Sequence, residues 1–159
     1  MNIEIRKAEN IDIDCLINLY GQLVDYECQF YYFLKNFKDF NVQNITSLKE
    51  DFLNWIKDDK HNVMVAILEN KIVGLIHGHI KDSYFYIGRI LELEELVIDE
   101  EYRHIGIAQQ LYDELINWGK QNQTEEIHLN AFHTNNNAIQ FYTKNGLNQH
   151  SMKMKGKIL

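Results

Sequence analysis

The segment at residues 91–121 constrains the fold most, because a strand runs through a polar turn directly into an amphipathic helix. The strand is rich in Leu, Val and Ile, and the turn at residues 99–101 is acidic. A glycine at such a turn lets the backbone approach a ligand closely, and a helix start offers free N–H groups that suit a phosphate. The segment therefore predicts an anion-binding turn. After Gly106, apolar residues recur at helical spacing, at Ala108, Leu111, Tyr112, Leu115, Ile116 and Gly119.

Periodicity along the rest of the chain indicates further strands and helices. The order is β-α-α-β-β-β-α-β-α-β, an α/β arrangement without linker or repeat, so a single domain at residues 1–159 is expected. Strands are expected at residues 3–6, 63–68, 72–80, 86–98, 126–131 and 147–155. Helices are expected at residues 13–24, 48–56, 106–121 and 135–145.

Polar residues near two helix starts are candidate caps. Asn10 or Asp12 precedes the first helix and can accept from its free N–H groups. Thr46 or Ser47, followed by Glu50, resembles a capping box for the second helix. These signals place the start of the second helix close to residue 47.

Composition narrows the function classes. The net charge is −7, which argues against a nucleic-acid surface and is compatible with a cationic small-molecule substrate. No stretch approaches the roughly 20 apolar residues of a membrane helix, and no signal-peptide layout is present. We therefore expect no membrane partner and a cytoplasmic location. Cys15 and Cys28 are interpreted as reduced structural thiols.

The loop at residues 103–108, Arg-His-Ile-Gly-Ile-Ala, excludes two common nucleotide motifs. It lacks the three glycines of a dinucleotide-binding loop, and no Gly-Lys-Ser/Thr follows as in a nucleoside-triphosphate loop. It resembles instead the pyrophosphate-binding loop, Arg/Gln-x-x-Gly-x-Gly/Ala, of the GNAT superfamily of acyl-CoA-dependent N-acetyltransferases.

Neighbouring blocks strengthen this resemblance. Residues 96–98 match the strand that precedes the family's loop, and residues 102–103 match its Tyr-Arg pair. A second family motif, Asn-x-x-Ala-x-x-Phe-Tyr-x-Lys-x-Gly, is matched by Asn135, Ala138, Phe141, Tyr142, Lys144 and Gly146. Asn135 can also cap the last helix. The departures from the family pattern are Glu100 for a frequent proline, His104 for a frequent glycine and Leu147 for a frequent phenylalanine.

The resemblance implies the GNAT fold, an α/β (α+β mixed) architecture. About four helices flank a central, mostly antiparallel mixed sheet of about six to seven strands. It also implies acetyl-CoA as co-substrate, no metal, and acetyl transfer to a primary amine by direct attack in a ternary complex. Residues expected to contact the cofactor are Leu96, Val97, Ile98, Arg103, His104, Ile105, Gly106, Ile107, Ala108, Asn135, Ala138 and Tyr142.

Acetyl transfer needs proton movements and a polarised carbonyl. By resemblance, the Leu96 amide would polarise the thioester carbonyl, and Tyr142 would act as general acid, since a tyrosine is protonated at neutral pH. The competing interpretation makes Tyr142 a core aromatic of its helix. Glu94 occupies the position of the base in polyamine-type members. Glu92 and Glu95 remain alternative candidates for the base, because a bulge would change which side chains share a strand face.

The remaining candidates concern the acceptor. His77 and His79 share one strand face without a third ligand at metal-like spacing, so strand or surface histidines are expected instead of zinc. The aromatic run at residues 26–33 is interpreted as part core and part acceptor-pocket wall.

The acidic balance favours a small cationic amine, such as a polyamine or an aminoglycoside, as acceptor. Protein N-termini and lysine side chains remain alternatives, and so does an acyl-CoA-binding sensor or partner module without turnover. Relatives often dimerise, so the resemblance is also compatible with a homodimer.

Overall fold

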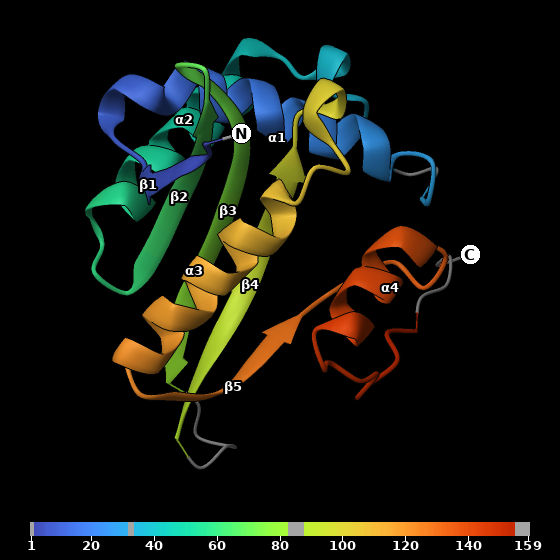
Figure 1. The fold of residues 1–159 in the computed structure, drawn as a ribbon. Coiled ribbons are helices and arrows are strands. Elements are labelled where there is room, and N and C mark those ends of the chain that lie inside the picture. The colour runs from blue at the N-terminus through green and yellow to red at the C-terminus, as the bar shows by residue number, and fades with distance from the viewer. Residues whose placement is uncertain (1, 32–33, 83–87, 155–159) are drawn as a thin grey trace.

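The computed structural model describes residues 2–31, 34–82 and 88–154. Its sheet has five strands in the order β1-β2-β3-β4-β5 (Figure 1). The strands are β1 Glu4–Lys7, β2 His61–Leu68, β3 Lys71–Asp82, β4 Arg89–Ile98 and β5 Thr124–Leu129. The helices are α1 Ile13–Glu27, α2 Val42–Lys57, α3 Ile107–Gln121 and α4 Asn136–Lys144. Short 3-10 helices are η1 Asn10–Asp12, η2 Phe37–Asp39 and η3 Glu100–Tyr102.

The sheet is mixed. Pairing is antiparallel from β1 through β4, and β5 runs parallel to β4. The parallel step follows from α3, which returns the chain along the sheet between β4 and β5. This arrangement confirms the expected α/β class and the order of the elements up to α4. Residues 86–87 of the expected fourth strand lie outside the described residues.

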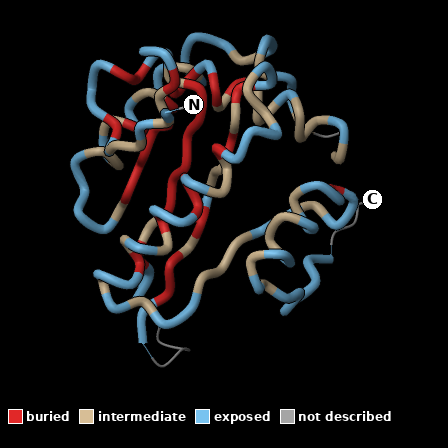
Figure 2. The backbone as a smooth tube through the Cα atoms, viewed as in Figure 1, coloured by how far each residue is buried: buried red, intermediate tan, exposed pale blue. Residues whose placement is uncertain are grey.

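Two apolar layers bury the sheet. On one face, α1 and α2 pack on β2 and β3 through residues such as Leu16, Phe52 and Leu75; we call this the α1/α2 face. On the other face, α3 packs through Leu111 and Leu115, and we call this the α3 face. The most deeply buried backbone runs along the central strands (Figure 2). Side chains on opposite faces of β4 therefore pack into different cores, one on the α1/α2 face and one on the α3 face.

The expected last strand at residues 147–155 is wrong over its described part. Residues 147–154 are irregular, and Met152 and Met154 are 72% and 82% exposed. An apolar pattern alone does not form a strand, because the backbone also needs a partner to complete its hydrogen bonds. The described sheet consequently has five strands where the resemblance implied six to seven.

The start of α2 also differs from the expectation. Asn41 Oδ1 accepts from the Asn44 N–H at 2.9 Å, and Asn44 Oδ1 accepts from the Asn41 N–H at 3.1 Å. This reciprocal box starts the helix at Val42, so Thr46 and Ser47 lie inside it. The predicted cap at these two residues was wrong because an Asn-x-x-Asn pair performs the role of the more familiar Ser/Thr-x-x-Glu.

The first helix lacks the expected side-chain cap. Asp12 directly precedes α1, but its carboxylate accepts from Arg6 at 2.7 Å and from the Glu9 N–H at 2.8 Å. The Arg6 guanidinium lowers the pKa of Asp12. Asn10, the other candidate, lies within η1. Asp12 thus joins β1 to the chain before α1.

We expect Asn41→Ala to lower the free energy of unfolding by about 1 kcal/mol, because the first turn of α2 loses its cap. Ser47→Ala is the control, and it should change stability by less than about 0.5 kcal/mol because Ser47 is an exposed residue within the helix. Urea unfolding followed by circular dichroism measures both. An equal loss in the two variants would contradict the assignment of the cap.

Candidate functional site

The carboxyl-terminal half of β4 has one open edge. β5 pairs with β4 only as far as Leu93, whereas β3 pairs with it as far as Ile98. Residues 94–98, which include Leu96 and Val97, thus have a neighbouring strand on one side only within the described chain. Unpaired backbone groups on such an edge can hydrogen-bond an extended ligand.

A bulge interrupts β4 where this edge begins. His77 of β3 lies opposite Glu95, and Gly78 lies opposite Leu93, so Glu94 is the extra residue. Both Glu94 and Glu95 consequently lie against histidines of β3. The bulge that the sequence left open is present, and simple alternation does not describe this strand.

The two carboxylates have different surroundings. Glu95 Oε2 lies 2.6 Å from His77 Nδ1, with side-chain exposures of 14% and 1%. Glu94 Oε1 lies 3.2 Å from His79 Nδ1, with side-chain exposures of 43% and 24%, and this contact lacks hydrogen-bond geometry. Glu92 is half-buried, in register with His128 of β5. Glu95 is therefore the more buried and more tightly bonded carboxylate, and Glu94 is the more exposed one.

The loop between β4 and α3 has the backbone of an anion-binding turn. His104 and Gly106 have φ values of +67° and +89°, and α3 begins at Ile107. A Cβ on Gly106 would meet no atom within 4 Å, so its backbone angle and not crowding requires glycine. His104, Ile105 and Gly106 are exposed, and Ile107 is buried against the α3 core. The positive end of the α3 dipole thus faces accessible backbone.

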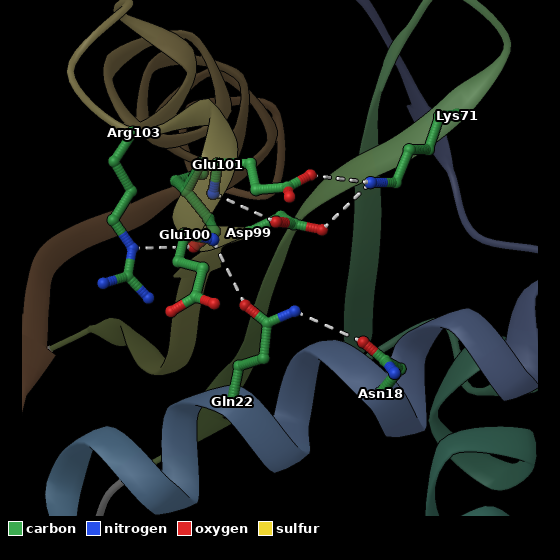
Figure 3. A network of polar contacts seen from close by, with 8 residues as sticks. Asn18, Gln22, Lys71, Asp99, Glu100, Glu101 and Arg103 are labelled. Atoms are coloured by element: carbon green, nitrogen blue, oxygen red, sulfur yellow. Dashed lines mark hydrogen bonds and ion pairs between the residues drawn. The ribbon is translucent and has the colours of Figure 1, made fainter.

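Polar contacts hold this loop to the rest of the fold (Figure 3). The Asp99 carboxylate lies 3.4 Å from Lys71 Nζ, and Gln22 Oε1 accepts from the Glu100 N–H at 3.2 Å. Arg103 Nε donates to the last carbonyl of β4 at 3.1 Å. The turn is therefore attached to α1 and β3 as well as to its own strand, which keeps the start of α3 beside the β4 edge.

Asn135 connects α4 to this region. Its Oδ1 accepts from the Ala138 N–H at 3.2 Å, which confirms the expected cap, and from the Tyr26 hydroxyl at 3.4 Å. The Arg103 guanidinium lies 5.5 Å from the Tyr26 ring centroid. The Tyr26 ring also contacts Phe30. Tyr26 therefore brings α1, the loop and the start of α4 together.

Tyr142 lies in a partly buried aromatic cluster on α4. Its ring centroid is 5.2 Å from that of Phe141 and 6.4 Å from that of Tyr112. Burial, with smaller contributions from Tyr112 and Glu27, raises the pKa of Tyr142 above its ordinary value. The phenol therefore holds its proton at neutral pH. Both interpretations of this residue, packing and proton donation, are compatible with this position.

A cavity that carries one carboxylate, Glu27, and one amine, Lys35, lies beside α1. This cavity of about 380 Å³ is lined by Tyr20, Val24, Glu27, Leu34, Lys35, Phe40 and Asn44. Burial and the nearby Glu95 raise the pKa of Glu27, and burial with the same carboxylates raises that of Tyr20 to about 12. Glu27 and Glu95 thus repel each other near one cavity. A cation placed between them would relieve that repulsion.

The aromatic run only partly matches its expected role. The ring centroids of Phe30 and Tyr31 lie 6.0 and 6.3 Å from that of Phe132, respectively. Neither residue lines the cavity. Tyr32 and Phe33 lie outside the described residues. Leu34 and Phe40 are the apolar cavity walls that follow the run.

His77 is not the surface histidine that was expected as one alternative. It is 1% exposed, its ring is stacked on Trp55 at 4.4 Å, and its Nε2 lies 2.9 Å from His61 Nδ1. No group of His, Cys, Asp and Glu side chains in the described chain is arranged to hold a metal ion.

Comparison with known proteins agrees with this geometry. Residues 23–147 match the family model described as the acetyltransferase (GNAT) family. The chain belongs to the GNAT family. It is an acetyltransferase of the class that uses acetyl-CoA as co-substrate.

Its relatives are distant but match along nearly the whole length. An uncharacterized N-acetyltransferase of Archaeoglobus fulgidus is 24% identical over 91% of this chain and 92% of its own. A Bacillus halodurans crystal structure has a TM-score of 0.85 at 22% identity, covering 98% of this chain and 99% of the other. An aminoglycoside acetyltransferase from a soil metagenomic sample, solved with sisomicin, has a TM-score of 0.71 at 19% identity, with coverages of 99% and 97%. These structures share the fold.

Sequence patterns missed several residues of this region. Glu27 stood at the end of an ordinary amphipathic helix, and Trp55 and His61 belonged to separate elements. A signal existed only for His77, as half of a His-x-His pair on a strand.

No helix among the described residues is long and apolar enough to span a membrane.

We expect Gly106→Ala to weaken acetyl-CoA binding about tenfold, because the free loop should leave a left-handed backbone that costs Ala about 1–2 kcal/mol. Acetyl-CoA binding must then restore this backbone, and each 1.4 kcal/mol is tenfold in affinity. Gly146→Ala is a matched control, since Gly146 has φ +87° and equally open space outside the loop. Isothermal titration calorimetry should detect the loss only at Gly106. Equal affinities for acetyl-CoA in both variants would contradict a cofactor role for the loop.

Proposed function

We propose that this enzyme moves the acetyl group of acetyl-CoA to a primary amine of a small cationic molecule, by direct attack in a ternary complex. The observation that carries the proposal is the pair Glu27 and Glu95: Glu27 lines the cavity, and Glu95, on the bulged strand β4, lies close enough to raise the pKa of Glu27. A polyamine or an aminoglycoside has the charge that such a pocket attracts.

Acetyl-CoA would be held by the exposed backbone of residues 103–108 and by the open edge of β4. Two features support binding of acetyl-CoA here. The space beside Gly106 is open, and the β4 edge has backbone groups that can hydrogen-bond the extended arm of the cofactor. Asn135, Ala138 and Tyr142 on the other side would contact the same arm. When bound, acetyl-CoA supplies the thioester that is transferred.

The reaction steps can be assigned to residues of this chain. The Leu96 amide would polarise the thioester carbonyl, and Tyr142, held protonated by burial, would donate to the leaving sulfur. Glu94, exposed at the bulge, would take the proton that the ammonium loses before attack. Glu95 is held at Oε2 by His77, so we assign it to binding the cation and not to the role of base.

A shared fold alone does not name the acceptor. The soil aminoglycoside acetyltransferase and a glucosamine-6-phosphate N-acetyltransferase of Arabidopsis thaliana both have this fold, the latter with a TM-score of 0.72. The neighbouring carboxylates of Glu27 and Glu95 favour the first kind of acceptor, because carboxylates repel a sugar phosphate.

The central test measures release of free thiol from acetyl-CoA over a panel of polyamines, aminoglycosides, amino sugars and peptides. We expect turnover with cationic small amines, and a loss of about 10²–10⁴-fold in kcat for Tyr142→Phe with little change in KM for acetyl-CoA. Tyr112→Phe, in the same aromatic cluster, is the matched control and should keep wild-type kcat.

Three other outcomes would redirect the proposal. Tight acetyl-CoA binding with no turnover on any amine would support a sensor or partner module. Turnover only on peptides would assign the activity to protein N-termini or lysine side chains. An unaltered rate in Tyr142→Phe would leave that residue with a packing role.

A further inference from the structure

We propose that Glu95, His77 and His61 share one exchangeable proton, and that this proton sets the charge with which Glu95 binds the ammonium of the acceptor. The inference deepens the proposed function and rests on it. It assigns Glu95 to substrate recognition, and His77 and His61 to positioning and to charge control.

The geometry is a continuous chain of hydrogen bonds across three strands. Glu95 Oε2 of β4 lies 2.6 Å from His77 Nδ1 of β3, and His77 Nε2 lies 2.9 Å from His61 Nδ1 of β2. The bulge at Glu94 makes this possible, because it turns Glu95 onto the α1/α2 face with His77. Each contact has the length of a strong hydrogen bond.

Trp55 covers the two rings. Its indole is stacked over His77 at 4.4 Å and over His61 at 6.0 Å, and the two imidazole planes differ by 22°. Nearly coplanar rings aim their nitrogens at each other. His77 is 1% exposed and His61 is half-buried, so solvent reaches the chain of bonds more readily at His61. The link between His77 and Glu95 is therefore buried, and each of its polar atoms has a fixed partner.

The two states of the network differ by one proton. In the first state, Glu95 is a carboxylate that accepts from His77 Nδ1–H, and His77 Nε2 accepts from His61 Nδ1–H. A proton that bonds to His61 Nε2 shifts the Nδ1 proton of His61 to His77 Nε2. The Nδ1 proton of His77 then moves to Glu95 Oε2. Each N–H bond that breaks is replaced by one that forms, and Glu95 ends as a neutral acid.

Charged groups around the network favour its ionised state when a cation is present. Tyr20 and Glu27 of α1 face Glu95, and the Glu27 carboxylate repels its charge. Asp58, after α2, and His79 of β3 face His61, whose pKa is lowered by burial and by His77. An ammonium near Glu27 would offset the repulsion, so its binding should expel the shared proton.

The neighbouring pair Glu94 and His79 provides the internal comparison. His79 Nδ1 has no hydrogen-bond partner in the described chain, and its 3.2 Å approach to Glu94 is not continued to another ring by a hydrogen bond. His79→Gln is therefore a matched control on the same strand face. His77→Gln keeps an N–H that can donate to Glu95 but carries no titratable ring.

The test is calorimetric titration of spermidine and of sisomicin into the protein saturated with CoA, near pH 6, in buffers of different ionisation enthalpy. We expect each wild-type binding event to release up to about one proton, because the cation selects the ionised state. His77→Gln and Glu95→Gln should release none, and His79→Gln should behave as wild type. Urea unfolding of every variant confirms that it is folded.

A kinetic profile gives the second readout. The amine KM of the wild type should rise as pH falls through the titration of the network, while KM for acetyl-CoA stays level. In His77→Gln this rise should move to lower pH, because Glu95 then has no imidazole with which to share the proton. His77→Leu tests the same point if the glutamine variant is unfolded.

Three results would overturn the inference in distinguishable ways. Amine binding without proton release, or an unshifted profile in His77→Gln, rejects the shared proton and leaves the acetyltransferase proposal intact. Loss of proton release in Glu94→Gln, with release retained in Glu95→Gln, would show that Glu94 and not Glu95 carries the charge. Failure of both amines to bind or react rejects the cationic acceptor, and the shared proton with it.

Discussion

The site depends on the point at which β4 loses its parallel partner. As far as Leu93 the strand is bonded on both sides, and beyond it only β3 remains. The bulge at Glu94 begins at the same position. One local change thus has two consequences: it frees backbone groups along residues 94–98 for an extended ligand, and it turns neighbouring carboxylates toward the α1/α2 face. The loop at residues 103–108 follows directly, so an anion site and an open strand edge are neighbours.

The buried polar network on that face is costly unless every member has a partner. Glu95, His77 and His61 meet this condition under the indole of Trp55. Removing one partner of such a buried set typically costs about 3–5 kcal/mol, whereas replacing the whole set by apolar side chains can be neutral. Stability alone therefore gives no reason for a carboxylate at this place in the core. Its position next to Glu27, which lines the cavity, gives a chemical one.

Sequence reasoning succeeded where the information is local. The helical spacing after Gly106 and the turn that precedes it are properties of consecutive residues, and α3 begins at Ile107, one residue after the expected start. The errors arose where local signals compete or need a distant partner. Asn41 and Asn44 form a box that Thr46 and Ser47 had been expected to supply. Residues 147–154 have apolar members but no paired strand.

By itself, the sequence determined the order of the elements up to α4, the glycine turn that leads into α3 and the family to which the chain belongs, because these depend on short-range periodicity and on motifs. Only the tertiary structure decided which carboxylate meets which histidine. A bulge shifts strand register by one residue, and a one-residue shift exchanges the faces of every side chain that follows. That shift is set by pairing between β3 and β4. It joined Glu95 to His77 and left Glu94 exposed, a distinction that adjacent glutamates in a sequence do not carry.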